Sequence, residues 1–312
     1  MNKRTPLKFT SRNKTDSRPA GYRKRAPAAR SDGYDERKMR DDKRPTHPKL
    51  TPKGQRLTAT PTSWGPVAEW YDKHLEKSGD TYHDKVIHPN LLRMLGDVKG
   101  KQMLDLGCGQ GIFSRLLADN GANVIGVDLG KELIAIAEKK NEGYAFNVHY
   151  FNSAAHDLFM VKDGTKDIVV CVLAIQNIEK LGETIAEASR VLKKGGKFIL
   201  VLNHPAFRNP QHTHWGYDEN EKVQYRRVDE YMSESKVKID MTPGSKEEKK
   251  FTVSFHRPLQ VYMKTFSKYG LAMTRLEEWE SHRKSQKGPK KAEEDKARKE
   301  IPLFLALELT KF

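Results

Sequence analysis

The sequence has little cysteine and no long apolar run, and both absences exclude classes of protein. Among 312 residues only Cys108 and Cys171 are cysteines, so neither a disulfide framework nor a cysteine-based metal site is available. No apolar run approaches the roughly 18 residues that a membrane-spanning helix needs. The N-terminal stretch also lacks the apolar core of a secretory signal. We therefore expect a cytoplasmic protein.

Acidic residues do not balance the basic ones, and the formal net charge is +16. The excess lies in two segments. Residues 1–63 carry 18 Lys and Arg against 6 Asp and Glu, and residues 281–300 carry 8 against 4. The rest of the chain is neutral. A neutral body with basic appendages indicates that any polyanion is met by the appendages and not by the folded domain.

Residues 1–63 have no helical or strand periodicity and are rich in Pro, Arg, Lys, Ser and Thr. Such a segment buries too little apolar surface to offset its ordering entropy, which predicts a basic, disordered tail. Phe9, Tyr22 and Tyr34 lie among the basic residues, a composition suited to stacking on unpaired bases while Arg and Lys meet phosphates. RNA or ribosome contact and a merely solubilising extension both remain open.

A folded domain is expected from residue 64 to residue 312, beginning with apolar residues at helical spacing. Short apolar strands then alternate with amphipathic helices, which predicts a parallel sheet covered on both faces. The expected strands are 103–106, 124–127, 147–151, 167–173, 197–202, 271–279 and 303–309. The expected helices are 87–95, 112–118, 131–140, 182–192 and 259–269. The charged link between the last two strands is either a loop or an exposed helix.

The regular alternation is interrupted by residues 203–257, a segment too long for an ordinary connection. We expect it to form an inserted cap. Within it, residues 236–241 and 249–255 alternate around a turn at 242–245, which predicts a β-hairpin.

A glycine-rich turn follows the first strand, in the sequence from Leu104 to Gly111. Such a turn lets backbone amides approach a ligand and points a helix N-terminus at it. A dinucleotide fingerprint would need a further glycine at position 112, which is Ile112, so NAD is disfavoured. The carboxylate of Asp105 also suits a cationic amine better than a pyrophosphate.

The segment LDLGCGQG resembles motif I of the class I S-adenosylmethionine-dependent methyltransferases, and GVDLGKELI, residues 126–134, resembles the acidic end of their second strand. The resemblance extends over most of residues 64–312 and is closest to the ubiquinone and menaquinone type of small-molecule methyltransferase. It implies an α/β fold, a Rossmann-like three-layer sandwich. Its mostly parallel sheet would have seven strands, with the last strand antiparallel. It also implies S-adenosyl-L-methionine as cofactor.

By this resemblance, Gly107, Gly109 and Gly111 surround the methionine part of the cofactor, with Asp105 near its ammonium. Asp128 ends the second strand and would accept the ribose hydroxyls, which agrees with a carboxylate at an adjacent strand end.

Three further parts of the cofactor site follow from the resemblance. Ser153, Ala154 and Ala155 correspond to the adenine-contacting segment, although the family usually has Asp where this chain has Ala154. Residues 172–176 correspond to the segment beside the sulfonium. Tyr71 is a candidate to cover the cofactor, with core packing as the alternative.

The acceptor is expected at the carboxyl ends of the strands, beneath the cap. His204 and His256 are candidates for general base or substrate orientation, and Arg257 for an anionic substrate group. Each could instead bond only within the cap. A His-x-His pair at 212 and 214 has no partner ligand in the sequence, so we expect no metal.

Two functions remain open. One is a small-molecule methyltransferase, favoured by the neutral body and the cap. The other is an RNA or ribosome-associated methyltransferase delivered by the basic tail. An Asn-Pro-Pro-Tyr segment, used by amino-directed methyltransferases, is absent after the fourth strand, and Cys171 is expected to pack in the core.

Overall fold

The computed structural model describes residues 63–77, 80–143, 148–242 and 249–312. The predicted tail, residues 1–63, therefore lies almost wholly outside the described residues, as does most of the predicted turn at 242–245. No described helix has the length and apolar character needed to cross a membrane.

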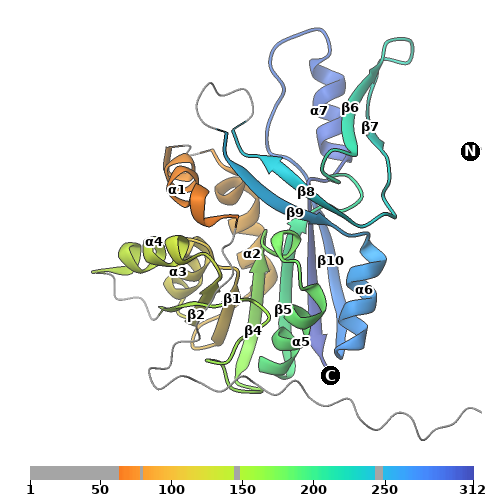
Figure 1. Cartoon of the computed structure of the whole chain (residues 1–312). Coiled ribbons are helices and arrows are strands. Elements are labelled where there is room, and N and C mark those ends of the chain that lie inside the picture. The colour runs from red at the N-terminus through yellow and green to blue at the C-terminus, as the bar shows by residue number, and fades with distance from the viewer. Residues whose placement is uncertain (1–62, 78–79, 144–147, 243–248) are drawn as a thin grey trace, which may run out of the picture. The chain divides into compact units, whose positions relative to one another are not determined.

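A seven-stranded sheet forms the centre of the domain, in the order β10-β11-β5-β4-β1-β2-β3 (Figure 1). The strands from β1 to β5 run parallel, whereas β11 is antiparallel to both of its neighbours. The predicted fold class, with its antiparallel last strand, is confirmed. The strands of this sheet are β1 (Gln102–Leu106), β2 (Asn123–Asp128), β3 (Val148–Asn152), β4 (Lys166–Val172), β5 (Leu192–Asn203), β10 (Leu271–Trp279) and β11 (Phe304–Lys311).

Helices cover both faces of this sheet, because its central strands are apolar on both sides. Along β5, Phe198, Leu200 and Leu202 face α5 and α6, while Ile199 and Val201 face α2 and α3. All five side chains are buried, and each contributes about 1.5–3 kcal/mol relative to exposure. The helices are α1 (Ala68–Lys77), α2 (His88–Leu95), α3 (Ile112–Asp119), α4 (Lys131–Asn141), α5 (Leu181–Val191), α6 (Leu259–Lys268) and α7 (Lys291–Glu300). Short helical turns are η2 (Gly65–Val67), η3 (His83–Ile87, a π-helix) and η4 (Ile175–Asn177).

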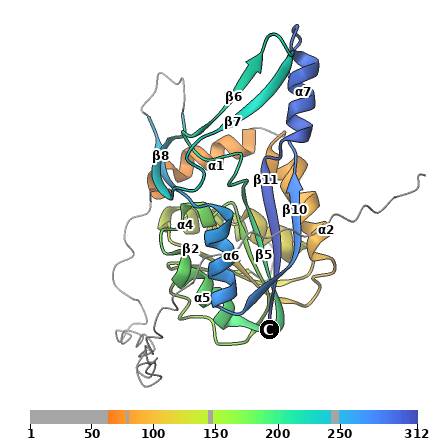
Figure 2. The same cartoon turned by 90° about the vertical axis from the view of Figure 1, so that its right-hand side faces the viewer.

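Two hairpins, not one, are inserted between β5 and α6. The predicted hairpin is present as β8 (Ser235–Asp240) and β9 (Phe251–His256), and it lies across the carboxyl ends of β4 and β5 (Figure 1). The prediction missed β6 (Thr213–Asp218) and β7 (Val223–Val228). This second hairpin extends beyond the sheet together with α7 (Figure 2). The charged link between β10 and β11, for which both a loop and an exposed helix were possible, contains the helix α7 in its second half.

Candidate functional site

The glycine-rich turn between β1 and α3 takes a backbone conformation that other residues rarely adopt. Gly107, Gly109 and Gly111 all have positive φ, at 77°, 54° and 76°. A Cβ at Gly107 would overlap the side chain of Ala174, whereas a Cβ at Gly109 would meet nothing within 4 Å. The turn is therefore packed on one side and open on the other, as a cradle for a ligand must be.

Asp105 lies beneath this turn and is 1% exposed. Its Oδ2 accepts a hydrogen bond of 2.6 Å from the Ser114 hydroxyl of α3. Burial raises the pKa of Asp105 to about 7, and the charge of Asp128 adds to the rise, while Ser114 opposes it. The sequence placed Asp105 beside a cofactor ammonium; the structure places it under the turn, held by α3.

Asp128 ends β2 and holds the turn by its carboxylate. Oδ1 accepts from the Gly130 amide at 2.7 Å and Oδ2 from the Gly109 amide at 3.0 Å. Burial raises the pKa of Asp128, and these amide hydrogen bonds lower it in part. The Leu129 amide also bonds this carboxylate, so three of its about four acceptor positions are used within the chain and a ligand hydroxyl can take the remaining one.

The predicted adenine segment follows β3 directly. Ser153 is buried, and its hydroxyl donates to the carbonyl of Asp157, within the same segment, at 2.8 Å. Its amide donates to the carbonyl of Asp128 at 3.0 Å, which fixes the segment beside the end of β2. Ala154 and Ala155 are half-buried at the same place. A polar contact from this segment would therefore come from the backbone.

Tyr71 lies on α1, which packs against α4. Its ring contacts Trp64 edge-on at 5.2 Å, and burial raises the pKa of its phenol to about 12. An ion pair between Asp72 and Lys140 joins the same two helices. Tyr71 therefore lies in a packed cluster over α4, the helix that follows Asp128.

A strained turn follows β4 and joins the glycine-rich turn to the cap. Leu173 has a φ of 55°, an uncommon value for a residue with a branched side chain. Its carbonyl accepts from the side-chain amides of Gln176 at 2.8 Å and Asn177 at 3.3 Å. Ala174 packs against Gly107, and Ser254 of β9 donates to the Gln176 carbonyl at 3.3 Å. Strain of this kind is held by surrounding bonds and is frequent at binding sites.

A narrow hollow lies at the carboxyl ends of β4 and β5, beneath β9. It brings together two of the predicted acceptor residues, His256 and Arg257, but not His204. Several other lining residues could not be predicted, because the cap brings them in from distant segments. The polar lining residues include Gln176, Arg208, His256 and Arg257.

His204 is 3% exposed and both of its ring nitrogens are engaged. The Ala206 amide donates to Nδ1 at 3.2 Å, so the neutral ring carries its proton on Nε2 and donates it to Glu278 at 2.7 Å. Burial lowers the pKa of His204, partly offset by Glu278. These contacts fit the alternative in which His204 bonds within the fold.

His256 is also buried, but only one of its nitrogens has a partner in the described part of the chain. Nε2 donates to the Tyr231 carbonyl at 2.8 Å, which leaves the lone pair on Nδ1. Burial lowers the pKa of His256, so the ring is neutral at pH 7. This is the protonation state that a general base requires.

Arg257 is 6% exposed and holds the turn after η4. One terminal nitrogen, Nη2, donates to the carbonyls of Ile178 at 2.9 Å and Glu179 at 2.8 Å. The other, Nη1, is buried without a hydrogen-bond partner by distance and angle, while the charge of Arg257 and a side-chain hydrogen bond from it oppose the rise of the Tyr262 pKa that burial causes. Glu234 lies 3.9 Å from Nε.

Within the described residues, no group of three or more His, Cys, Asp or Glu side chains could hold a metal ion. His212 and His214 contribute to no such group. Cys108 and Cys171 are buried and free, and burial raises the pKa of both thiols.

Residues 104–200 match a protein family described as "Methyltransferase domain". This range begins at β1 and ends within β5, and so includes the glycine-rich turn, Asp128 and the strained turn after β4.

Curated relatives share this part of the chain. A ubiquinone biosynthesis O-methyltransferase of Pseudomonas aeruginosa is 30% identical over 144 residues, which are 46% of this chain and 60% of that protein. The chain thus spans less than two thirds of the length of such relatives.

Solved structures share the fold over a longer range. A S-adenosylmethionine-dependent methyltransferase of Mesorhizobium loti is 24% identical and covers 74% of this chain and 99% of its own, with a TM-score of 0.58. A Listeria monocytogenes protein, described as a candidate enzyme of the same kind, is 26% identical and covers 72% of this chain and 97% of its own, with a TM-score of 0.56.

Proposed function

We propose that this chain, which carries a class I S-adenosylmethionine-dependent methyltransferase domain, transfers a methyl group from S-adenosyl-L-methionine to a small acceptor. The observation that carries the proposal is the narrow hollow at the ends of β4 and β5. It lies under an inserted cap and contains a neutral histidine. A narrow hollow beneath an inserted cap suits a small molecule better than a polymer.

The residues around the glycine-rich turn fit the cofactor. Gly109 leaves open space, and Gly107 and Gly111 allow the backbone to pass close to their neighbours. Asp128 at the end of β2 retains an acceptor position for a ribose hydroxyl, and the segment of Ser153, Ala154 and Ala155 lies beside it for the adenine. The bound cofactor supplies a methyl group on a sulfonium, and the chain's own part is alignment and proton removal.

We propose different roles for the three acceptor-side residues. His256 acts as general base through Nδ1, because its other nitrogen is committed to a carbonyl. Arg257 orients the acceptor through the unpartnered Nη1. His204 positions the loop after β5, since its two nitrogens are bonded to Ala206 and Glu278. Tyr71 covers the cofactor side through α1.

The domain limits stay a proposal: a basic tail over residues 1–63 and a catalytic domain over 64–312, with the cap at about 203–257. The alternative function, methylation of RNA or of a ribosomal component, rests on the charge of that tail. A cytoplasmic location is consistent with the two free cysteines.

The test is methyl transfer from radiolabelled S-adenosylmethionine by the full-length protein. Two pools from the source cells are offered, metabolites below about 1 kDa and total RNA, with Asp128→Ala as a blank. Label in the metabolite pool supports the proposal. Label in the RNA pool alone overturns it in favour of the alternative. Calorimetric titration with S-adenosylhomocysteine, run in parallel, tests the cofactor site without any acceptor.

A further inference from the structure

The cap contains arginines that no carboxylate in the described structure neutralises. Other arginines of the domain have carboxylate partners: the half-buried Arg190 pairs with Glu187 and Asp163, and the exposed Arg93 pairs with Glu277. Within the described residues, Arg208, Arg226 and Arg298 form no ion pair. Such a group of like charges is costly unless an anion from outside the chain joins it.

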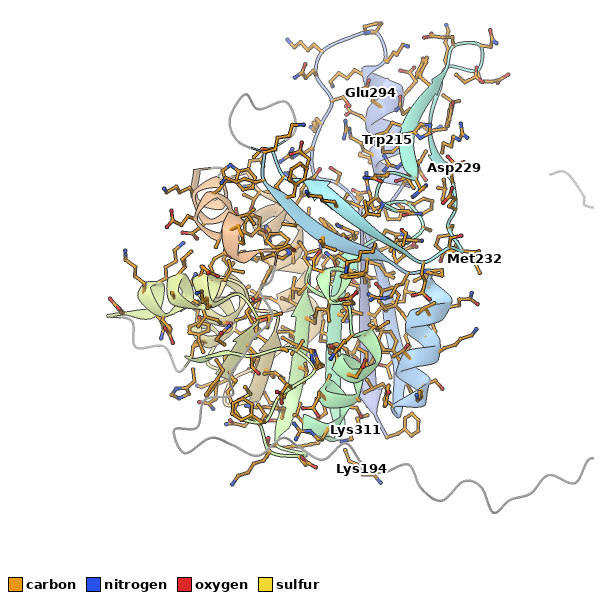
Figure 3. All side chains as sticks on the ribbon, viewed as in Figure 1. Lys194, Trp215, Asp229, Met232, Glu294 and Lys311 are labelled. Atoms are coloured by element: carbon orange, nitrogen blue, oxygen red, sulfur yellow. The ribbon has the colours of Figure 1, made fainter. Side chains whose placement is uncertain are left out.

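Two of these guanidinium groups lie over one aromatic ring. The Arg208 and Arg226 guanidinium carbons are 5.8 Å and 5.1 Å from the centre of the Trp215 ring. Trp215 is on β6, and the paired strand β7 packs against α7, the helix that bears Arg298 (Figure 3). Burial is the main cause that lowers the pKa of Arg208 to about 10, and the charges of Arg226 and Arg298 contribute to this shift.

Arg226 and Arg298 have local hydrogen bonds that Arg208 lacks. Arg226 donates to the Phe207 carbonyl at 3.0 Å and to the Thr213 hydroxyl at 2.7 Å. Arg298 donates to the Ser285 hydroxyl at 3.2 Å. Nε of Arg208 is buried with no partner. Arg208 is therefore the cation of the group that is left with an unsatisfied donor.

Arg208 also lines the hollow at the ends of β4 and β5, together with Arg257 and Gln176. Each of the three has a buried atom without a partner: Nε of Arg208, Nη1 of Arg257 and Oε1 of Gln176. The oxygen and nitrogen of the Gln176 amide are distinguished, because Nε2 donates to the Leu173 carbonyl. The hollow thus offers two cationic donors and one acceptor, a set that matches an anionic group and a neighbouring O–H or N–H.

We infer that the acceptor is a small anion, whose carboxylate or phosphate group binds Arg208 in this hollow and whose neighbouring O–H or N–H group, other than the one that His256 deprotonates, donates to Gln176. This inference rests on the proposed function for its link to methyl transfer, but the anion site itself does not depend on it. Arg257 supplies the second donor, and Arg226 and Arg298 strengthen the positive potential around Arg208.

The test uses benzoate and inorganic phosphate as probes on the full-length protein saturated with S-adenosylhomocysteine. Binding is measured by ligand-observed nuclear magnetic resonance for benzoate and by calorimetry for phosphate. We expect Arg208→Gln to weaken binding of at least one probe by tenfold or more, and Arg208→Lys to weaken it less. Arg227→Gln is the matched control, because Arg227 is on the same strand as Arg226, is exposed and pairs with Asp229. It should bind like the natural protein.

A second measurement separates an anion-binding arginine from a structural one. With no anion present and at low salt, Arg208→Gln should raise the thermal midpoint, because it removes an unneutralised charge; a fall would show that Arg208 is needed for folding and would overturn the inference. Equal binding of both probes by the natural protein and Arg208→Gln would overturn it as well. If S-adenosylhomocysteine fails to bind, the proposed function fails, and probe binding by the protein alone still decides the anion site.

Discussion

The two sides of the cleft hold their buried charges in different ways. At the ends of β1 and β2, the carboxylates of Asp105 and Asp128 receive donors from Ser114, Gly109 and Gly130. At the ends of β4 and β5, Arg208 and Arg257 each keep a buried donor without a partner. On the first side both carboxylates are bonded within the chain, although Gln110 Nε2 and Tyr150 Oη are buried without a partner. On the second side Arg208 has no carboxylate partner among the described residues, whereas Arg257 lies 3.9 Å from Glu234.

Among the changes that test this comparison, we expect Gly107→Val to have the largest effect on cofactor affinity. The residue has a φ of 77°, and any Cβ would overlap Ala174, so the substitution must displace either the turn or the strained segment after β4. We expect S-adenosylhomocysteine affinity to fall by more than about a hundredfold, or 2.7 kcal/mol. Calorimetry measures it.

The matched control is Gly96→Val, at the end of α2. Gly96 has a φ of 67° but open space around the added Cβ. It should destabilise the fold by about 1–3 kcal/mol and leave cofactor affinity near normal. Equal loss of binding in both variants would mean that backbone strain, and not the contact with Ala174, governs the site.

Asp128→Ala comes next in size. It removes the acceptor for two backbone amides of the turn and the proposed partner of the ribose hydroxyls. Loss of charge-assisted hydrogen bonds of this kind costs about 1.5–3 kcal/mol each, so we expect affinity for S-adenosylhomocysteine to fall by at least about thirtyfold. Asp119→Ala, exposed at the end of α3, serves as the control. Near-normal affinity of Asp128→Ala would refute the placement of the ribose.

Paired and unpaired arginines should differ in their effect on stability. Arg190 bonds Glu187, Asp163 and the carbonyls of Leu158 and Val161. Arg190→Gln should therefore lower the free energy of unfolding by about 2–4 kcal/mol.

Arg298→Gln should change it by less than about 0.5 kcal/mol, or raise it at low salt, because Arg298 has no carboxylate partner among the described residues. Urea unfolding at two salt concentrations measures both. Similar losses in the two variants would remove the contrast between the sides of the cleft.

The sequence predicted the features that depend on residues close together in the chain, and it did not predict those that depend on contacts between distant segments. The strands, helices and glycine-rich turn depend on local patterns, and their existence was correctly predicted. The hairpin of β6 and β7 was missed because it lacks apolar alternation. Its residues include His214, Arg226 and Arg227, and its Trp215 packs under Arg226 of the paired strand and under Arg208, which precedes the hairpin. No local pattern could show this.

The acceptor side was predictable only in part, for the same reason. His256 and Arg257 follow a predicted strand, so their place near the cap was a sound expectation. The partners that decide their roles are Tyr231 and the carbonyls of Ile178 and Glu179, 25 to 79 residues away. Glu278, which engages His204, is 74 residues away. Roles that depend on such distant partners cannot be read from one sequence.

The smallest effect concerns the charge of His204 and is measured as the pH dependence of stability. Its folded pKa is below 6.5, so as pH falls under 6.5 the unfolded chain takes up a proton before the folded one. Stability should therefore fall from pH 6.5 down to the folded pKa and then level off, by no more than about 1.4 kcal/mol for each unit of pKa shift.

His204→Gln should lose this component, and the difference between the two unfolding curves isolates it from other groups. If the natural protein instead gains stability as pH falls through this range, the Glu278 ion pair outweighs burial. A charged His204 would then add another cation to the acceptor side, and the contrast between the two sides of the cleft would be greater than the neutral ring implies.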